Sequence, residues 1–294
     1  MRKTTNETLT IGIPKGSLQD STIDLFARAG FKIGTSSRSY FPTIDHERMN
    51  CIMFRAQEMS RYVEDGIVDV GLTGQDWIIE NGSDVREISR LQYSKATFKP
   101  ARWVLAVPEE SGIRSIEDLD GGVVATELVN TTRKYFEQKG ISVKVEFSWG
   151  ATEVKARLLD GIVDVTETGS SLKANKLRVI DTIMESTTRL IANRDAMKID
   201  WKREQIENIA MLLNAAIDAG GMVGLKMNVP ADKVDEIMKI LPSEKSPTVS
   251  NLKDKGWVAI EVVLNEADER DLVPVLKRAG ASGIITYPLN KIIH

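Results

Sequence analysis

Cysteine and histidine are both scarce in this sequence. The 294 residues include one cysteine, Cys51, and two histidines, His46 and His294. A single cysteine excludes a disulfide bond within the chain and a cysteine-based zinc cluster. Two histidines so far apart disfavour a histidine-rich metal site and a Ser-His-Asp hydrolase. Since Cys51 lies in an apolar run, we expect a buried thiol on a strand.

The sequence also lacks a strong charge imbalance and long apolar runs. Lys and Arg total 39 and Asp and Glu total 42, so the formal net charge is −3. This charge disfavours a nucleic-acid partner but allows a local cationic pocket for a small phosphorylated ligand. No segment approaches the ~20 apolar residues of a membrane span. The N-terminal residues lack the apolar stretch of a secretory signal. We therefore expect a soluble, cytoplasmic protein without a membrane partner.

The first part of the chain has the pattern of an α/β fold. The length predicts two or three domains at about 100–200 residues each. Residues 9–13 predict a strand, and residues 14–17, Pro-Lys-Gly-Ser, have turn chemistry. Residues 18–29 carry apolar side chains at roughly helical spacing before Gly30, a typical C-cap. Strand, turn and helix in this order begin an α/β fold.

An internal repeat is the most informative feature. Asp-Gly-Ile-Val-Asp-Val occurs at residues 65–70 and again at residues 160–165, and Thr-Gly follows at the same offset in both copies. The 95-residue period is too long for a solenoid. We predict two related α/β lobes, each with a helix, a glycine turn, a short buried strand and a Thr-Gly loop that opens a helix. Convergence on the same local pattern is the alternative.

Two apolar strands predict where the chain crosses between the lobes. Residues 102–107 form one, followed by a break, and residues 188–192 form the other. We assign lobe one to residues 1–107 and 186–220 and lobe two to residues 108–185. The ligand cleft is expected between them, because domain interfaces are a preferred place for ligand sites.

The last part of the chain predicts a separate small domain. Strand and helix patterns follow one another there as β-α-β-β-α-β, which is the ferredoxin-like order. We assign residues 221–294 to this domain.

The second copy of the repeat continues into a loop that could carry chemistry. Asp164 and Glu167 precede residues 168–172, Thr-Gly-Ser-Ser-Leu, and a helix is predicted to begin near Lys173. Amides and hydroxyls in such a loop attract anions, and the two carboxylates suit ribose hydroxyls or a magnesium ion held by phosphates. This pattern is typical of a phosphoribosyl pyrophosphate site. A capping loop with solvated carboxylates is equally compatible with these residues alone.

Other candidate residues are expected around the cleft. Thr73 and Gly74 occupy the equivalent position in lobe one, where Leu72 replaces the second carboxylate, which suits a second ligand or a structural loop. Lys15 and Gly16 follow the first strand, at the end where open α/β sheets bind ligands. Four further cations are candidates either for the cleft or for the solvated surface: Arg55, Arg102, Arg133 and Lys134.

These segments together resemble the long form of ATP phosphoribosyltransferase over the whole chain. Residues 15–18 are similar to the family's Lys-Gly-Arg-Leu turn, with Ser17 in place of the arginine. Residues 69–76 are similar to its Asp-Val-Gly-Ile-x-Gly-x-Asp segment, and residues 164–172 match its most specific motif. Further similar segments lie at residues 125–133, 150–153, 246–249 and 280–284.

The resemblance implies two periplasmic-binding-protein-like α/β lobes around a cleft and a ferredoxin-like regulatory domain. It also implies the first reaction of histidine biosynthesis, a glycosyl transfer. Adenine N1 of ATP attacks the anomeric carbon of phosphoribosyl pyrophosphate, and pyrophosphate leaves. The N1 lone pair is already a nucleophile, so no base is required. Mg²⁺ and protein cations would neutralise the departing pyrophosphate.

The resemblance also implies roles for individual residues. Asp164 and Glu167 would bind the ribose hydroxyls and are the candidate protein contacts to Mg²⁺, which the substrate phosphates mainly hold. Glu153 would lie near the leaving group. The 5′-phosphate would bind Thr168, Gly169, Ser170, Ser171 and Leu172. ATP would bind Lys15, Gly16, Arg55, Asp69, Thr73 and Gly74, with Lys15 or Arg55 compensating for Ser17.

For the C-terminal domain the resemblance implies feedback control. Histidine, the pathway end product, would bind between subunits at Asn228, Thr248 and Ala281. It would shift a homo-hexamer built from dimers towards an inactive arrangement. An oligomerisation domain without a ligand is the alternative.

Two functions of other classes remain as hypotheses. A two-lobed solute-binding protein would share the lobes and crossings, but it usually carries a secretory signal or lipid anchor and has no use for the loop at residues 164–172. A sensor with catalytically dead lobes is compatible with Ser17. Product formation from ATP and phosphoribosyl pyrophosphate discriminates among the three.

Overall fold

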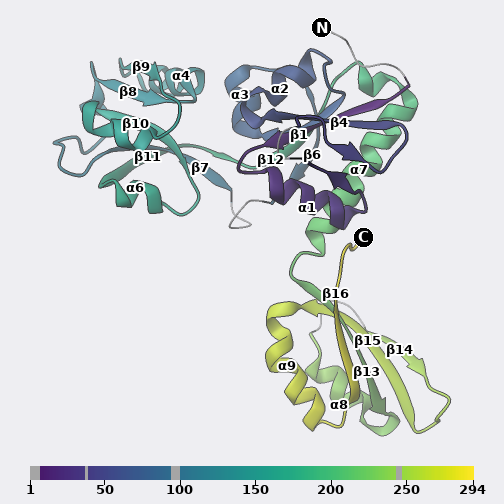
Figure 1. The fold of residues 1–294 in the computed structure, drawn as a ribbon. Coiled ribbons are helices and arrows are strands. Elements are labelled where there is room, and N and C mark those ends of the chain that lie inside the picture. The colour runs from purple at the N-terminus through teal and green to yellow at the C-terminus, as the bar shows by residue number, and fades with distance from the viewer. Residues whose placement is uncertain (1–6, 37–38, 94–99, 243–246) are drawn as a thin grey trace. The chain divides into compact units, whose positions relative to one another are not determined.

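The computed structural model describes residues 7–36, 39–93, 100–242 and 247–294. These residues divide into two compact units, Met1–Ala210 and Met211–His294 (Figure 1). Ser246, part of one similar segment, lies outside the described residues. None of the described helices combines the length and apolar character needed to cross a membrane.

The first sheet of the N-terminal unit has the strand order β4-β1-β5-β12-β6. β4, β1 and β5 are parallel, and β12 is antiparallel to both β5 and β6. This sheet and its helices are called lobe one below. Its strands are β1 (Leu9–Lys15), β4 (Met49–Arg55), β5 (Val70–Gly74), β6 (Arg86–Leu91) and β12 (Thr188–Ala192), with the short pair β2 (Ile33–Gly34) and β3 (Thr43–Ile44). Its helices are α1 (Gln19–Ala29), α2 (Ala56–Glu64) and α3 (Gln75–Asn81).

The second sheet of this unit has the order β11-β7-β10-β8-β9. β10, β8 and β9 are parallel, and β7 is antiparallel to both β10 and β11. This sheet and its helices are called lobe two. Its strands are β7 (Ala101–Pro108), β8 (Val123–Thr126), β9 (Lys144–Phe147), β10 (Gly161–Thr166) and β11 (Leu177–Ser186). Its helices are α4 (Val129–Lys139), α5 (Thr152–Lys155) and α6 (Ser170–Ala174).

The two sheets share one topology. The parallel strands β4-β1-β5 correspond to β9-β8-β10, and an antiparallel strand and an edge strand follow in each sheet. The chain crosses between the two sheets twice: β7 follows β6 but joins lobe two, and β12 follows β11 but returns to lobe one. The predicted boundary at residue 107 is therefore wrong: lobe two includes β7 and begins near Ala101.

The two copies of the repeat form strands at different positions. In lobe one, residues 65–69 lie outside the strand, and β5 occupies Val70–Gly74. Helix α3 then begins directly at Gln75. In lobe two, β10 ends at Thr166, so residues 167–169 remain as a loop before α6. The predicted Thr-Gly loop is thus present in lobe two and replaced by strand in lobe one.

Helix α2 packs closely on the first sheet because glycine leaves room for it. A Cβ atom at Gly71 would lie 2.7 Å from Sδ of Met59, which is fully buried. Met59 forms a small core with Val63 and Ile191. Cys51 on β4 is also buried, which confirms the expected strand thiol, and burial raises its pKa to about 12.

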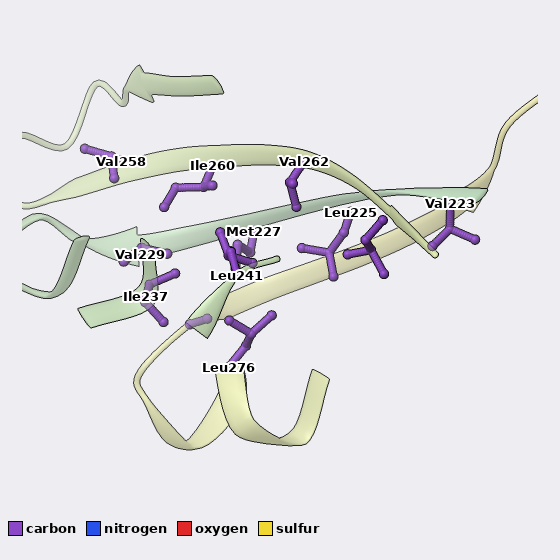
Figure 2. Packing of buried hydrophobic residues seen from close by; sticks show 12 residues of the cluster. Val223, Leu225, Met227, Val229, Ile237, Leu241, Val258, Ile260, Val262 and Leu276 are labelled. Atoms are coloured by element: carbon purple, nitrogen blue, oxygen red, sulfur yellow. The ribbon is translucent and has the colours of Figure 1, made fainter. Parts of the chain in front are cut away.

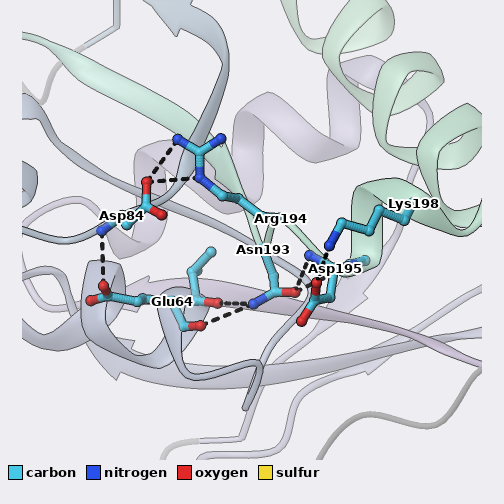
Figure 3. A network of polar contacts seen from close by, with 8 residues as sticks. Glu64, Asp84, Asn193, Arg194, Asp195 and Lys198 are labelled. Carbon is cyan, nitrogen blue, oxygen red and sulfur yellow. Dashed lines mark hydrogen bonds and ion pairs between the residues drawn. The ribbon is translucent and has the colours of Figure 1, made fainter.

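Asn193 anchors the chain where it leaves β12. Its Nδ2 donates to the carbonyls of Val63 (2.9 Å) and Glu64 (3.0 Å) at the end of α2 (Figure 3). Its Oδ1 accepts from the amides of Asp195 and Ala196. The connection from β12 towards α7 (Asp200–Asp218) is therefore tied to α2.

The C-terminal unit contains one antiparallel sheet in the order β14-β15-β13-β16. Its elements are β13 (Met222–Pro230), α8 (Val234–Ile240), β14 (Thr248–Asn251), β15 (Trp257–Asn265), α9 (Glu266–Arg278) and β16 (Ser282–Pro288). This confirms the ferredoxin-like order. Alternate residues of β13, Leu225, Met227 and Val229, pack with Ile237 and Leu276 of the helices (Figure 2).

The C-terminal unit begins earlier than the predicted residue 221. It starts at Met211, within α7. The amide of Ile292 donates to the carbonyl of Ala215 at 2.9 Å, which joins the end of this helix to the last residues of the chain. Sequence patterns mark where a helix ends but not which unit it packs against.

Candidate active site

A cavity of about 320 Å³ in the N-terminal unit is lined by both lobes. Such a volume suits a small-molecule ligand. Lobe one contributes residues from the ends of β1, β4 and β5, the turn before α1 and the first turns of α2 and α3. Among them are Lys15, Gly16, Ser17, Leu18, Arg55, Gln57, Gly74, Asp76 and Trp77. Lobe two contributes residues that include Ala101, Trp103, Glu127, Val165, Glu167 and Ser186. The predicted cleft between the lobes is thus present.

Two cations lie on the lobe one side of this cavity. Lys15 ends β1, and its Nζ lies 3.6 Å from the ring centroid of Tyr40. Arg55 ends β4, and its Cζ lies 5.6 Å from the ring centroid of Trp149 in lobe two. Gly16 follows Lys15 with a φ of 107°, a conformation that favours glycine. Of the four further candidate cations, Arg55 lines the cavity, whereas Arg102, Arg133 and Lys134 do not.

Carboxylates lie on the lobe two side. Glu127 and Glu167 line the cavity. Asp164 on β10 is partly buried and does not line it. The pKa of Asp164 is raised to about 6, mainly by burial and also by the negative charges of Glu153 and Glu127, against the lowering effect of a hydrogen bond from the Val165 amide. This region of lobe two would therefore favour a cation or hydroxyl donors.

The loop after β10 presents several hydroxyl groups. The Gly169 amide donates to Oγ1 of Thr166 at 2.7 Å, and Gly169 has a φ of 78°. The hydroxyls of Thr168 and Ser170, both exposed, lie 2.8 Å apart. Such a loop, with exposed hydroxyls at a helix start, can bind an anion.

Two other loop residues have local partners. The hydroxyl of Ser171 donates to Oε1 of Glu153 at 2.8 Å, so α5 helps to fix the loop. Leu172 is 3% exposed and belongs to the core of lobe two. The predicted ligand contact is therefore wrong for the side chain of Leu172, which instead packs in the core and anchors α6.

Asp69 and Thr73 are not available to a ligand, contrary to the prediction for them. The side chain of Asp69 is 2% exposed, and its carboxylate binds Nζ of Lys202 and the amide of Thr10, each at 2.8 Å. Thr73 is fully buried, and its hydroxyl donates to the carbonyl of Ala56 at 2.7 Å. Neither lines the cavity. Both have structural roles because strand β5 occupies the place of the expected loop.

The sequence reasoning missed an aromatic and acidic wall of the cavity. Nε1 of Trp103 on β7 donates to Oδ2 of Asp76 on α3 at 2.6 Å. The rings of Trp77 and Trp103 pack edge to face, with centroids 6.0 Å apart. Burial raises the pKa of Asp76, which is 6% exposed, and the hydrogen bonds from Trp103 and Ser186 oppose that rise. Asp76 is the last residue of the segment at 69–76 that resembles the family. Nothing in the sequence around Trp103 distinguishes it from a tryptophan of the core.

Comparison with known proteins identifies the family. Residues 55–215 match the family model "ATP phosphoribosyltransferase", and residues 219–291 match "HisG, C-terminal domain". An ATP phosphoribosyltransferase of Pelodictyon phaeoclathratiforme is 59% identical over 289 residues, 98% of each chain. One of Prosthecochloris aestuarii is 59% identical over 286 residues, 97% of each chain. The chain belongs to the ATP phosphoribosyltransferase family.

A solved structure supports this assignment. A chain of the ATP phosphoribosyl transferase (HisG:HisZ) complex of Thermotoga maritima superposes with a TM-score of 0.60 and 26% identity, covering 70% of this chain and 99% of that one. The predicted fold class of two periplasmic-binding-protein-like lobes and a ferredoxin-like domain is confirmed. ATP phosphoribosyltransferases are enzymes of the first step of histidine biosynthesis, and the solute-binding alternative is not favoured.

The candidate regulatory residues of this ATP phosphoribosyltransferase lie in the C-terminal unit. Asn228 and Thr248 are exposed, on β13 and β14 respectively. Asn228 lies opposite Ala259 of β15, and Thr248 lies opposite Glu261 of the same strand. Because Ala259 and Glu261 are two residues apart, all four side chains lie on one face of the sheet. Ala281 is 1% exposed and its side chain belongs to the core. The prediction that this side chain contacts a ligand is therefore wrong.

A divalent metal ion takes part in this family's reaction. Among the described residues, no group of three or more His, Cys, Asp or Glu side chains could hold a metal ion. Magnesium commonly binds through one or two carboxylates together with substrate phosphates. The carboxylates beside the cavity fit that arrangement, because Asp164 and Glu167 lie on one strand and its following loop.

Proposed function

We propose that this chain joins the phosphoribosyl group of phosphoribosyl pyrophosphate to N1 of ATP within the cavity between lobes one and two. Pyrophosphate leaves and phosphoribosyl-ATP forms. One observation carries the proposal: Glu127 and Glu167 of lobe two meet Lys15 and Arg55 of lobe one around a single cavity. The hydroxyl-rich loop follows Glu167 directly in the chain. Two polyphosphate substrates require this combination of acceptors and cations.

Phosphoribosyl pyrophosphate is assigned to lobe two. Glu167 and Asp164 accept hydrogen bonds from the ribose hydroxyls, and the Thr168 and Ser170 hydroxyls donate to the 5′-phosphate. Glu153 holds Ser171 and thereby the loop. Asp164 and Glu167 would be the protein contacts of a Mg²⁺ ion held mainly by the substrate phosphates, and that ion would supply neutralising charge for the pyrophosphate. The raised pKa of Asp164 supports a cation or hydroxyl partner here.

ATP is assigned to lobe one. Lys15 and Arg55 face the polyphosphate, and the Gly16 and Gly74 backbones allow its close approach. These two cations supply the charge that Ser17 does not. The neutral N1 atom needs no base, so these residues accelerate the reaction by aligning two substrates and by stabilising the leaving group.

The regulatory part of the proposal concerns the C-terminal unit. Histidine binds at the sheet face with Asn228 and Thr248 and shifts a homo-hexamer built from dimers to a less active arrangement. The exposed positions of both side chains support this assignment. We place the enzyme in the cytoplasm, where its substrates are made.

Calorimetric titration tests the substrate assignment. Glu167→Gln should weaken binding of phosphoribosyl pyrophosphate with Mg²⁺ by about tenfold or more, because a charged hydrogen-bond acceptor is lost. Glu146→Gln is the control, since Glu146 pairs with Lys144 in lobe two away from the cavity. Equal affinities for both variants and the wild type would contradict the assignment.

Histidine titration tests the regulatory assignment. Histidine should give binding heat, change the sedimentation coefficient and lower activity, and Thr248→Val should weaken all three effects. Absence of heat and of any sedimentation change in the wild type would refute the regulatory role without affecting the catalytic one.

A further inference from the structure

The first turn of helix α4 in lobe two lacks a local cap. The residue before the helix is Leu128, whose side chain offers no hydrogen-bond acceptor. Helices leave their first amides unpaired unless a side chain or solvent accepts from them. The missing acceptor comes from lobe one.

Glu80 of helix α3 caps α4 across the lobes. Its Oε1 accepts from the amide of Asn130 at 2.9 Å. Its Oε2 accepts from the amide and the hydroxyl of Thr131, at 2.9 and 2.8 Å. The Asn130 side-chain amide in turn donates to the Glu80 carbonyl at 3.0 Å. Glu80 is only 8% exposed, so these bonds form largely out of solvent.

A carboxylate is well suited to this position. Hydrogen bonds to a charged acceptor are stronger than neutral ones, and a negative charge is favourable at the positive end of a helix dipole. Glu80 satisfies both conditions for a helix fifty residues further along the chain. The contact fixes where α4 begins relative to lobe one.

The capped turn adjoins the cavity. Glu127, which lines the cavity, lies three residues before Asn130, and its Oε2 is 3.4 Å from Nε2 of Gln57 in lobe one. One turn before Glu80 on the same helix, Asp76 accepts from Trp103 of lobe two. Helix α3 therefore holds lobe two at two points, both close to the cavity wall.

The geometry points to Glu80 as a positioning residue that sets the alignment of the two lobes across the cavity. This inference rests on the proposed function, in which each lobe holds one substrate. Loss of Glu80 leaves both substrate contacts in place and disturbs their alignment. Misplacement by about 1 Å can cost about 100-fold in rate.

Steady-state kinetics of Glu80→Ala and Glu80→Gln test this role. We expect kcat to fall by about 10- to 100-fold for Glu80→Ala, with both KM values within about threefold of the wild type. Glu80→Gln retains one acceptor oxygen and should recover part of kcat. The matched control is Glu64→Ala, because Glu64 accepts from the Asp84 amide at 3.0 Å within lobe one (Figure 3). Its kcat should stay within about twofold of the wild type.

A second variant keeps the test decisive if Glu80→Ala folds poorly. Thr131→Val removes only the hydroxyl contact with Glu80 and should lower kcat in the same direction, by less. Lower melting temperatures with unchanged kcat in the Glu80 variants and in Thr131→Val would overturn the inference, as would a rise of KM in proportion to the loss of kcat. If Glu167→Gln behaves as proposed while Glu80 variants keep full kcat, only the inference about Glu80 fails.

Discussion

Nζ of Lys202 lies 2.8 Å from Oδ1 of Asp69, and both side chains are almost fully buried. Asp69 and Asp164 occupy the same position in the two copies of the repeat. The lysine of α7 thus neutralises the aspartate of lobe one, whereas burial and the charges of Glu153 and Glu127 raise the pKa of Asp164 in lobe two. The aspartate of the first copy is therefore structural, whereas the proposed function assigns that of the second copy to a ligand.

Lys202→Met should strongly destabilise the protein. Removing one partner leaves a buried carboxylate uncompensated, and such changes cost about 3–5 kcal/mol. Lys198→Met is the control, because Lys198 also lies 2.8 Å from its partner Asp195 but both are exposed. That variant should change the free energy of unfolding by about 1 kcal/mol at most. Urea unfolding that gives equal losses for the two variants would contradict the structural role of Asp69.

Asp164→Asn should change the pH dependence of stability. The folded pKa of about 6 exceeds the unfolded value, so the folded state binds this proton more tightly and the wild type loses stability as pH rises from about 4 to about 6. About one pH unit above the folded pKa this loss is complete. The variant should therefore gain about 1–3 kcal/mol relative to the wild type across that window. Urea unfolding at pH 4.5, 5.5 and 7 measures the difference, and a pH-independent difference would disagree with the assignment.

Arg55→Met should slow phosphoribosyl transfer more than the removal of a cation that lies outside the cavity. Arg55 lines the cavity, and loss of one donor to a developing charge costs about 100-fold or more in rate. Lys134→Met is the control, because Lys134 is exposed and does not line the cavity. Measured kcat/KM values that fall equally in both variants would remove the basis for a specific role of Arg55.

Trp103→Phe should destabilise the joint between the lobes in a pH-dependent way. It removes the indole N–H that donates to Asp76 at 2.6 Å, a loss of about 1–3 kcal/mol. That hydrogen bond opposes the rise in the pKa of buried Asp76, so its loss raises the pKa further. The loss therefore costs more stability at high pH, where Asp76 is charged, than at low pH, where it is protonated. Melting temperatures at high and low pH measure this, and in Asp76→Asn/Trp103→Phe the additional pH dependence should disappear.

Local patterns predicted much of the fold. The β-α-β-β-α-β order of the C-terminal unit follows from apolar periodicity and glycine turns, and Cys51 was expected on a buried strand. The strand at residues 102–107 was also expected, but not its sheet, because pairing of β7 with β10 and β11 depends on contacts distant in sequence.

The sequence predicted those residues of the candidate site that are both charged and accessible from the cavity. Lys15, Arg55 and Glu167 do line one cavity. The repeat could not reveal that Asp69 is neutralised by a lysine 133 residues away. It also could not reveal Glu80, whose role exists only because α4 lacks a cap of its own.

Product formation in the presence of ATP, phosphoribosyl pyrophosphate and Mg²⁺ tests the central claim most directly. The ultraviolet absorbance of the N1-substituted adenine should rise with the wild type, and this rise should be abolished or slowed about 100-fold by Glu167→Gln and by Arg55→Met, from opposite sides of the cavity. A wild type that forms no product, or variants of both lobes that form it at the wild-type rate, would contradict the account.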